Sequence, residues 1–205
     1  MQASAPRADD CPFCHPRAQQ NALWESDHYR VIADESPRCV GHVLLLTKAH
    51  CPCHAALMDE HQPEFLRAQA RVRRFLQETF GAASFVEHGS GERQDVPHAH
   101  LHGLPFAAAL PQPLRDNSGL QPVRDWFDVR QEWVRLGHYI YVETGEGRFL
   151  IPDASYDLLL DDLRRQLAAQ TEATIDPRTR VLVRLGPAVV ERTRQTWKEW
   201  ESGQT

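Results

Sequence analysis

The sequence lacks the features of a membrane or secreted protein. None of its apolar runs approaches the roughly 18 residues that a helix needs to span a bilayer, and residues 1–10 contain no apolar stretch typical of a signal peptide. There is no excess of positive charge, because 23 lysines and arginines against 28 acidic residues leave a net charge of −5. We therefore expect a cytoplasmic protein that contacts no membrane and no long nucleic acid, although a mononucleotide needs only a few local donors.

Disulfide bonds are not indicated either. The chain has five cysteines, an odd number, and without an export signal these favour free thiols or metal ligands over a disulfide framework. Histidine, in contrast, is abundant, with 11 residues. The remaining composition, 41% apolar and 25% charged, is that of an ordinary globular protein.

Hydrophobic patterning predicts an α+β fold: an antiparallel sheet with one long helix, then a C-terminal hairpin and further helices. The long helix is expected over residues 55–80, where Pro63 indicates a short helix followed by a longer one. A Gly-Glu-Gly turn between residues 139–143 and 148–151 predicts the hairpin. The other expected elements are strands near 29–32, 43–46, 84–88 and 96–105, and helices over 126–136, 155–170 and 187–200.

Three histidines alternate with apolar residues in the sequence His98-Ala99-His100-Leu101-His102. Alternate side chains of a strand point to the same face, so we expect the three imidazoles to lie together. Packing alone does not favour this, since each ring brings two polar nitrogens that burial would leave to be satisfied. The pattern indicates nucleophilic catalysis on phosphorus, in which one neutral imidazole attacks and its neighbours assist. The alternatives are an exposed histidine-rich stretch and a plain metal site.

The segment 98–104 resembles the signature of the histidine triad (HIT) superfamily, with Gly103 at a position that is usually hydrophobic. The resemblance continues upstream through residues 34–37, 41–46 and 48–50, in the same order and at similar spacing. It implies a HIT-like fold, a small-molecule nucleotide as substrate and, because family members often dimerise, a homodimer.

The resemblance also divides the chain. Residues 11–105 are expected to form the nucleotide-binding catalytic domain. Residues 1–10, which are small and polar, are expected to be a disordered lead-in. Residues 106–205 are expected to be a C-terminal extension packed on the same domain.

By resemblance, His100 is the expected nucleophile and His102 the expected contact of the phosphate, with His98 as the third member of the catalytic trio. The first reactive step is then the attack of His100 on the α-phosphate of a nucleotide conjugate, which gives a covalent nucleotidyl-histidine.

Three further residues are expected to bind the substrate. Asp34 matches an acidic residue that contacts the ribose hydroxyls, and a carboxylate can accept from both; its alternative role is that of a turn residue. Gln94 matches a glutamine of the family's phosphate loop. Asp95 stands where the family commonly has serine, and its carboxylate would repel a phosphate unless it were protonated or turned away.

A structural zinc site is also expected. The spacing of Cys11 and Cys14 lets both thiolates bind one tetrahedral ion, although redox pairs share this motif. Zinc-containing HIT proteins resemble this arrangement, and the resemblance implies His50 and His98 as the other two ligands. The neighbouring residues Cys51, Cys53 and His54 stay open as alternative ligands.

Together these features favour an enzyme, a hydrolase of dinucleoside polyphosphates or nucleoside phosphoramidates. One alternative is a nucleotidyltransferase or phosphorylase of the same superfamily, which uses a different acceptor. Another is a catalytically idle, zinc-stabilised module that only binds a nucleotide.

Overall fold

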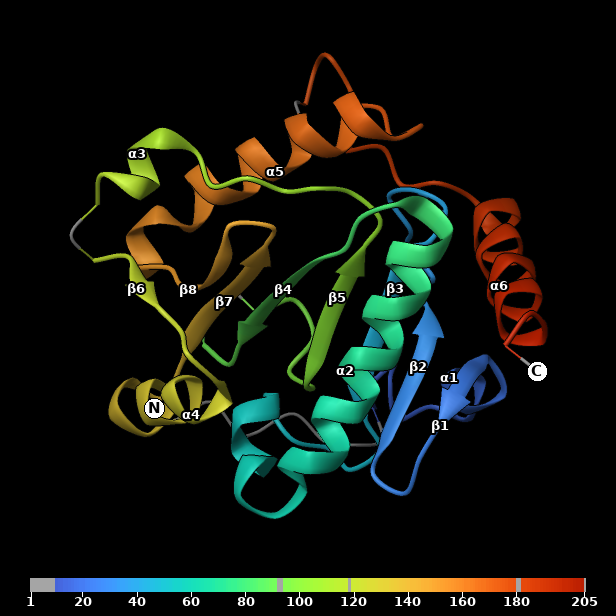
Figure 1. The fold of residues 1–205 in the computed structure, drawn as a ribbon, viewed down its shortest axis with the longest axis horizontal. Helices are drawn as coiled ribbons and strands as arrows, with labels where there is room; N and C mark the ends of the chain where they lie inside the picture. The colour runs from blue at the N-terminus through green and yellow to red at the C-terminus, as the bar shows by residue number, and fades with distance from the viewer. Residues whose placement is uncertain (1–9, 92–93, 118, 180–181, 205) are drawn as a thin grey trace.

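The computed structural model describes residues 10–91, 94–117, 119–179 and 182–204, and within them it forms one eight-stranded sheet (Figure 1). The strand order is β1-β2-β3-β5-β4-β7-β8-β6, and every pair of neighbours is antiparallel. The strands are β1 (Ala22–Glu25), β2 (Tyr29–Ala33), β3 (Val43–Thr47), β4 (Ser84–Gly89), β5 (His100–Leu104), β6 (Gln121–Pro122), β7 (Tyr139–Thr144) and β8 (Gly147–Leu150).

The strand that carries the histidines lies at the centre of the sheet. Strand β5 pairs with β3 on one side, where His100 lies opposite Leu46 and His102 opposite Leu44. Strand β4 pairs with it on the other side. A central strand has its backbone groups bonded on both edges, so the side chains of β5 are held in a rigid frame.

The first face of the sheet is covered by the long helix α2 (Met58–Phe80), which follows a 3₁₀ turn η2 (His54–Leu57). Alternate strand residues such as Leu45 and Leu101 pack there with Phe75 and Leu76 of α2 in the largest apolar cluster. Helices α4 (Trp126–Leu136) and α6 (Pro187–Ser202) add the buried side chains of three tryptophans, Trp126, Trp197 and Trp200.

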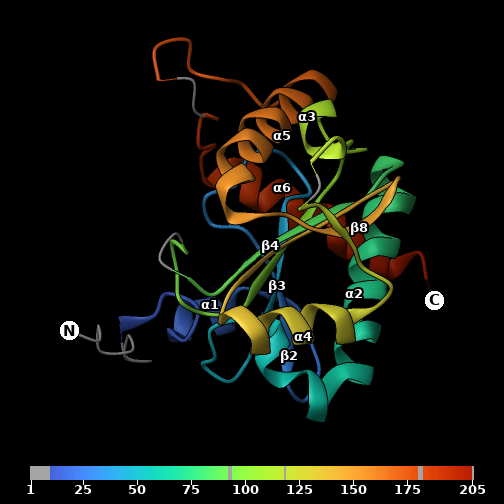
Figure 2. The same ribbon diagram turned by 90° about the vertical axis from the view of Figure 1, so that its left-hand side faces the viewer.

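The second face is covered by helix α5 (Tyr156–Gln170), together with the short helix α3 (Gln112–Arg115). Figure 2 shows α5 and α3 on one side of the sheet and α2 and α4 on the other. The apolar stripe of α5, formed by Leu159, Leu163 and Leu167, packs against Val86, Ile140 and other residues of the strands below. A short helix α1 (Pro16–Gln20) precedes β1, and a 3₁₀ turn η3 (Asp153–Ser155) precedes α5.

The predicted fold class, α+β with an antiparallel sheet, a long helix and a C-terminal hairpin with helices, is confirmed. Three details differ. The long helix does not divide at Pro63, which lies inside α2; the break comes earlier, between η2 and α2. The strand expected near 96–105 is shorter, His100–Leu104, so His98 precedes it. Strands β1 and β6 and helices α1 and α3 were not expected, because their short segments carry little periodicity of their own.

The segment boundaries at residues 10 and 105 stay predictions. Of the expected lead-in 1–10, residues 1–9 lie outside the described residues. The extension 106–205 supplies strands β6, β7 and β8 to the same sheet, since β7 pairs with β4 along its whole length. The catalytic and nucleotide-binding character assigned to residues 11–105 is a matter of function rather than of topology.

None of the helices in the described part of the chain combines the length and the apolarity that crossing a bilayer requires. The cytoplasmic location and the homodimer stay predictions.

Gly103, the unusual residue of the histidine motif, marks the closest approach of α2 to the sheet. A Cβ atom at this position would lie 2.9 Å from Val72 Cγ1, 3.1 Å from Val43 Cγ2 and 3.3 Å from Leu76 Cδ1. The helix therefore packs directly on the backbone of β5 at Gly103, the residue that follows His102.

We expect Gly103→Ala to destabilise the protein by about 1–3 kcal/mol, because the added methyl group overpacks a close contact. The measurement is the free energy of unfolding in urea. Gly145→Ala is the matched control, since a Cβ there meets nothing within 4 Å. Equal stability of the two variants would contradict the close packing of α2 on β5.

Candidate functional site

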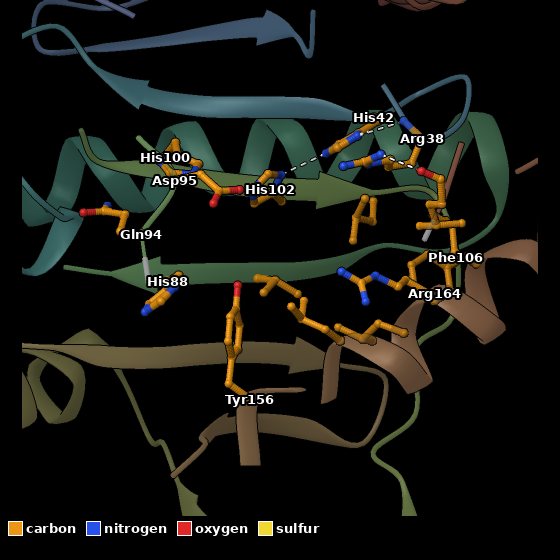
Figure 3. Close-up of a pocket in the computed structure, with 16 residues that line it drawn as sticks. Arg38, His42, His88, Gln94, Asp95, His100, His102, Phe106, Tyr156 and Arg164 are labelled. Carbon is orange, nitrogen blue, oxygen red and sulfur yellow. Dashed lines mark hydrogen bonds between the residues drawn. The ribbon is translucent and has the colours of Figure 1, made fainter. Parts of the chain in front are cut away.

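A cleft of about 950 Å³, including its open mouth, lies on the α5 face of the sheet (Figure 3). One wall comes from the sheet and the loops at its ends, and the opposite wall comes from α5. The residues that line the cleft are Arg38, His42, Val86, His88, Gln94, Asp95, His100, His102, Leu104, Phe106, Tyr156, Leu160, Leu163, Arg164, Leu167 and Leu182.

His100 lies in this cleft with one ring nitrogen already bonded. Its Nδ1 lies 2.6 Å from the carbonyl oxygen of His98, so Nδ1–H donates and the proton stays on that nitrogen. The other nitrogen, Nε2, then carries a free lone pair. Burial of the ring lowers the pKa of His100, which favours the neutral form. A neutral imidazole with an available lone pair is a nucleophile.

His102 lies beside His100, with ring centroids 5.1 Å apart. Its Nδ1 is 2.9 Å from Nε2 of His42, a residue on the loop before β3. Nδ1 of His42 lies 3.3 Å from both the backbone nitrogen of Arg38 and the carboxylate of Asp34. When the proton of His42 is on Nε2, this ring donates to His102, whose own proton is then on Nε2. Burial holds the pKa of His102 well below its usual value, so this ring too is neutral.

The third histidine, His98, has a different environment. It precedes β5, and its Nε2 lies 2.8 Å from the carbonyl oxygen of Thr47, to which it donates. Its Nδ1 faces the thiols of Cys11 and Cys14, each 3.4 Å away. The prediction that three imidazoles lie side by side is therefore realised for His100 and His102, while His98 turns towards the cysteines.

The three expected substrate-binding residues lie in different places. Gln94 and Asp95 line the cleft, and the side-chain amide of Gln94 donates to the carbonyl oxygen of Pro52. Asp34 does not belong to the lining of the cleft; its carboxylate lies 3.3 Å from Nδ1 of His42 and accepts from the backbone N–H of Ser36. Its contact with a ribose stays a prediction, and so do the phosphate contacts of Gln94 and Asp95.

The four expected metal ligands converge on one point. The ligand atoms of Cys11, Cys14, His50 and His98 all lie within 4.8 Å of one another. Nδ1 of His50 is 3.3 Å from both the Cys14 thiol and Nδ1 of His98. A tetrahedral zinc ion, with bonds of about 2.0–2.1 Å to nitrogen and 2.3 Å to sulfur, separates its ligand atoms by about 3.3–3.8 Å. The cluster fits such an ion in both chemistry and spacing.

The alternative ligands are engaged elsewhere. The Cys51 thiol lies 3.4 Å from Thr47 Oγ1, and Cys53 is buried in the core below α2. His54 is fully buried and its Nδ1 pairs with Glu87 at 2.8 Å. None of the three belongs to the Cys/His cluster found among the described residues.

Several residues of the site were not expected from the sequence. Phe13 lies between the two cysteines and packs its ring 5.3 Å from that of His100, so the cysteine loop contacts the reactive histidine. His42 lines the cleft and contacts His102, which positions that ring. Arg164 and Tyr156 come from α5, and no sequence motif in that helix indicates that they line a cleft. Only their position on the inward face of an amphipathic helix is visible in the sequence.

Comparison with known proteins gives the class. Residues 15–108 match the family model of the HIT domain. The resemblance of the histidine motif to that superfamily is confirmed over this part of the chain. A search of curated proteins found no match.

Solved structures of the same class are similar over part of the chain. A HIT family member from Bacillus subtilis is 21% identical and matches 62% of this chain and 96% of its own, with a TM-score of 0.44. A zinc-bound histidine triad family protein from Mycobacterium smegmatis is 21% identical and matches 64% and 98%, with a TM-score of 0.39. A HIT-like protein involved in cell-cycle regulation from Bartonella henselae is 18% identical and matches 53% and 83%, with a TM-score of 0.44.

We expect Cys11→Ser to remove bound zinc and to lower the melting temperature, because hydroxyl is a poor ligand for this ion and three ligands hold it more weakly. The measurement is the zinc content per chain after dialysis, together with thermal unfolding. Cys39→Ala is the control: Cys39 is equally buried but lies outside the cluster, so its zinc content should equal that of the parent protein. Unchanged zinc in Cys11→Ser would contradict the assignment of the cluster.

Proposed function

We propose that this protein is a nucleotide hydrolase that works through a covalent nucleotidyl-His100 intermediate, with dinucleoside polyphosphates or nucleoside phosphoramidates as substrates. The single observation that carries the proposal is the bond from His100 Nδ1 to the His98 carbonyl oxygen, because it leaves Nε2 as the nucleophilic atom of a ring that lines the cleft. HIT-domain proteins are typically nucleotide hydrolases or transferases, which agrees with this assignment.

In the first step, Nε2 of His100 forms a bond to the α-phosphorus, and the bond from phosphorus to the leaving group breaks. The ring becomes positively charged as it is nucleotidylated, and the carbonyl oxygen of His98 stabilises that charge through Nδ1–H. With His42 donating to its Nδ1, His102 carries its proton on Nε2 and donates it to an oxygen of the phosphoryl group.

In the second step, water attacks the phosphorus of the intermediate. The bond from phosphorus to His100 breaks and its electron pair returns to Nε2, while the attacking water loses a proton to solvent. The nucleoside monophosphate leaves, and the ring is again neutral with its proton on Nδ1. Both steps use the same nitrogen atom, so one buried imidazole divides a difficult displacement into two easier ones.

The metal cluster would contribute to this chemistry by holding His98 in position. Cys11, Cys14, His50 and His98 are the residues that would hold zinc, and with four protein ligands the ion would be structural. His98 joins that cluster through Nδ1 while its carbonyl oxygen accepts from His100. A rigid His98 therefore supports the orientation of the nucleophile.

We expect His100→Ala to abolish the covalent intermediate and to lower turnover by several orders of magnitude, since the attacking atom is gone. The protein is mixed with adenylylated substrates, including diadenosine tetraphosphate and adenosine 5′-phosphoramidate, and denatured at alkaline pH, where a phosphorus–nitrogen bond survives. Intact-mass spectrometry should show one added adenosine monophosphate on the parent protein and none on His100→Ala.

His138→Ala is the control, because His138 lies outside the cleft and should keep the adduct. A parent protein that binds these compounds without adduct or turnover would contradict the proposal and favour an idle binding module. Faster loss of the adduct on adding inorganic phosphate or a sugar phosphate, with a new nucleotide as product, would favour the transferase.

A further inference from the structure

The wall of the cleft opposite the histidines belongs to the C-terminal extension. Helix α5 contributes Tyr156, Leu160, Leu163, Arg164 and Leu167, and the segment after it contributes Leu182. All of these residues lie beyond residues 15–108, the part that matches the HIT domain. The extension therefore builds a surface that a substrate at His100 would contact within the same chain.

Two arginines from distant parts of the chain meet in this cleft. Arg38 lies on the loop between β2 and β3, and Arg164 lies on α5. Figure 3 shows them at the Phe106 end of the cleft, with the guanidinium group of Arg164 directed towards the space below His102. Burial lowers the pKa of Arg38, and the positive charges of a third arginine, Arg184, and of Arg164 lower it further.

The existing partners of these arginines leave donors available. Arg38 donates from Nη1 to the carbonyl oxygen of Leu182 at 2.9 Å, and a guanidinium group has five N–H donors in all. Arg164 pairs through Nη1 with Asp161 at 3.0 Å, and Asp161 is 57% exposed, so this ion pair is weak. Two acidic residues, Asp34 and Asp95, also act favourably on Arg38.

Like charges that gather at one end of a partly buried cleft repel one another unless an anion joins them. Guanidinium groups bind phosphate with particular geometric fit, through parallel N–H donors. Figure 3 shows His100 at the end of the cleft that also holds Gln94 and Asp95, and by the proposed function the reacting phosphate would lie there. The arginines face a different part of a bound substrate.

We propose that Arg38 and Arg164 bind a second phosphate of the substrate, separate from the phosphate that His100 attacks. The substrate class is then a nucleotide with at least one additional phosphate, either on the leaving chain or on the ribose. This inference rests on the proposed function for the position of the reacting phosphate, but the anion site itself is testable without turnover.

The first experiment measures binding of inorganic tripolyphosphate by calorimetry to the full-length protein. Arg164→Gln should weaken binding about 10-fold or more, as expected for loss of a charge-assisted contact. The matched control is Arg165→Gln, which removes the same charge from the next residue of α5; Arg165 pairs with Asp162, lies outside the cleft and should bind as the parent does. Equal loss in both variants, or no loss in either, would overturn the anion site.

The second experiment compares kcat/KM for three adenylyl donors. These are adenosine 5′-phosphoramidate, its 3′-phosphorylated derivative, and diadenosine tetraphosphate. For each donor with a second phosphate, kcat/KM is divided by the value for the plain phosphoramidate. Arg164→Gln should lower this ratio about 10-fold. A fall for diadenosine tetraphosphate alone assigns the phosphate to the leaving chain, and a fall for the 3′-phosphorylated donor alone assigns it to the ribose.

The two proposals fail in different ways. If His100 forms no adduct with any donor while Arg164→Gln still loses tripolyphosphate, the hydrolase assignment is wrong and the anion site stands. If the adduct forms and Arg164→Gln keeps the same ratios as Arg165→Gln for both phosphate-bearing donors, the anion site is wrong and the hydrolase assignment stands.

Discussion

The position of one proton controls the chemistry that this cleft can perform. The ring of His100 donates from Nδ1 to the carbonyl oxygen of His98, two residues earlier. This short-range contact is possible because the chain enters β5 at His100, so the backbone of His98 is free of sheet pairing on that side. The remaining nitrogen keeps its lone pair in a buried environment that disfavours the charged ring. A freely rotating histidine would present either nitrogen, so only part of its population would direct the reactive lone pair into the cleft.

The surrounding structure serves to hold that short segment in place. His98 is fixed on one side by the carbonyl oxygen of Thr47 and on the other by the cysteine cluster. The same cysteine loop places Phe13 against the ring of His100. On the opposite face of the strand, α2 packs against the backbone at Gly103, so β5 has contacts above and below. Metal ligands, aromatic packing and a glycine contact thus act on the same six residues, 98–103.

The two faces of the sheet differ: one packs in the apolar core and the other lines the cleft. Its α2 face is a continuous apolar cluster with the three tryptophans of α4 and α6, and it provides most of the buried core. Its α5 face holds the cleft, where polar groups of the strands meet a helix that is apolar on one side and carries Arg164 and Tyr156. The extension joins this arrangement through β7, which continues the sheet beyond β4. Helix α5, which lies outside the part that matches the HIT domain, therefore forms one wall of the cleft in which His100 lies.

Local sequence patterns determined a large part of this protein. The alternation of His98, His100 and His102, the Cys-x-x-Cys spacing and the helical periodicity of α2 and α5 act over a few residues, and strand and helix geometry converts them directly into shared faces. The fold class and the position of His100 and His102 on a strand followed from them. The bond between His42 and His102 and the contact of Phe13 with His100 join residues that are 60 or more positions apart in the chain, and Arg38 and Arg164, further apart still, line one cleft. Only the tertiary structure decided those contacts, because they depend on the order of the strands in the sheet and on which face each helix covers, and no local periodicity carries that information.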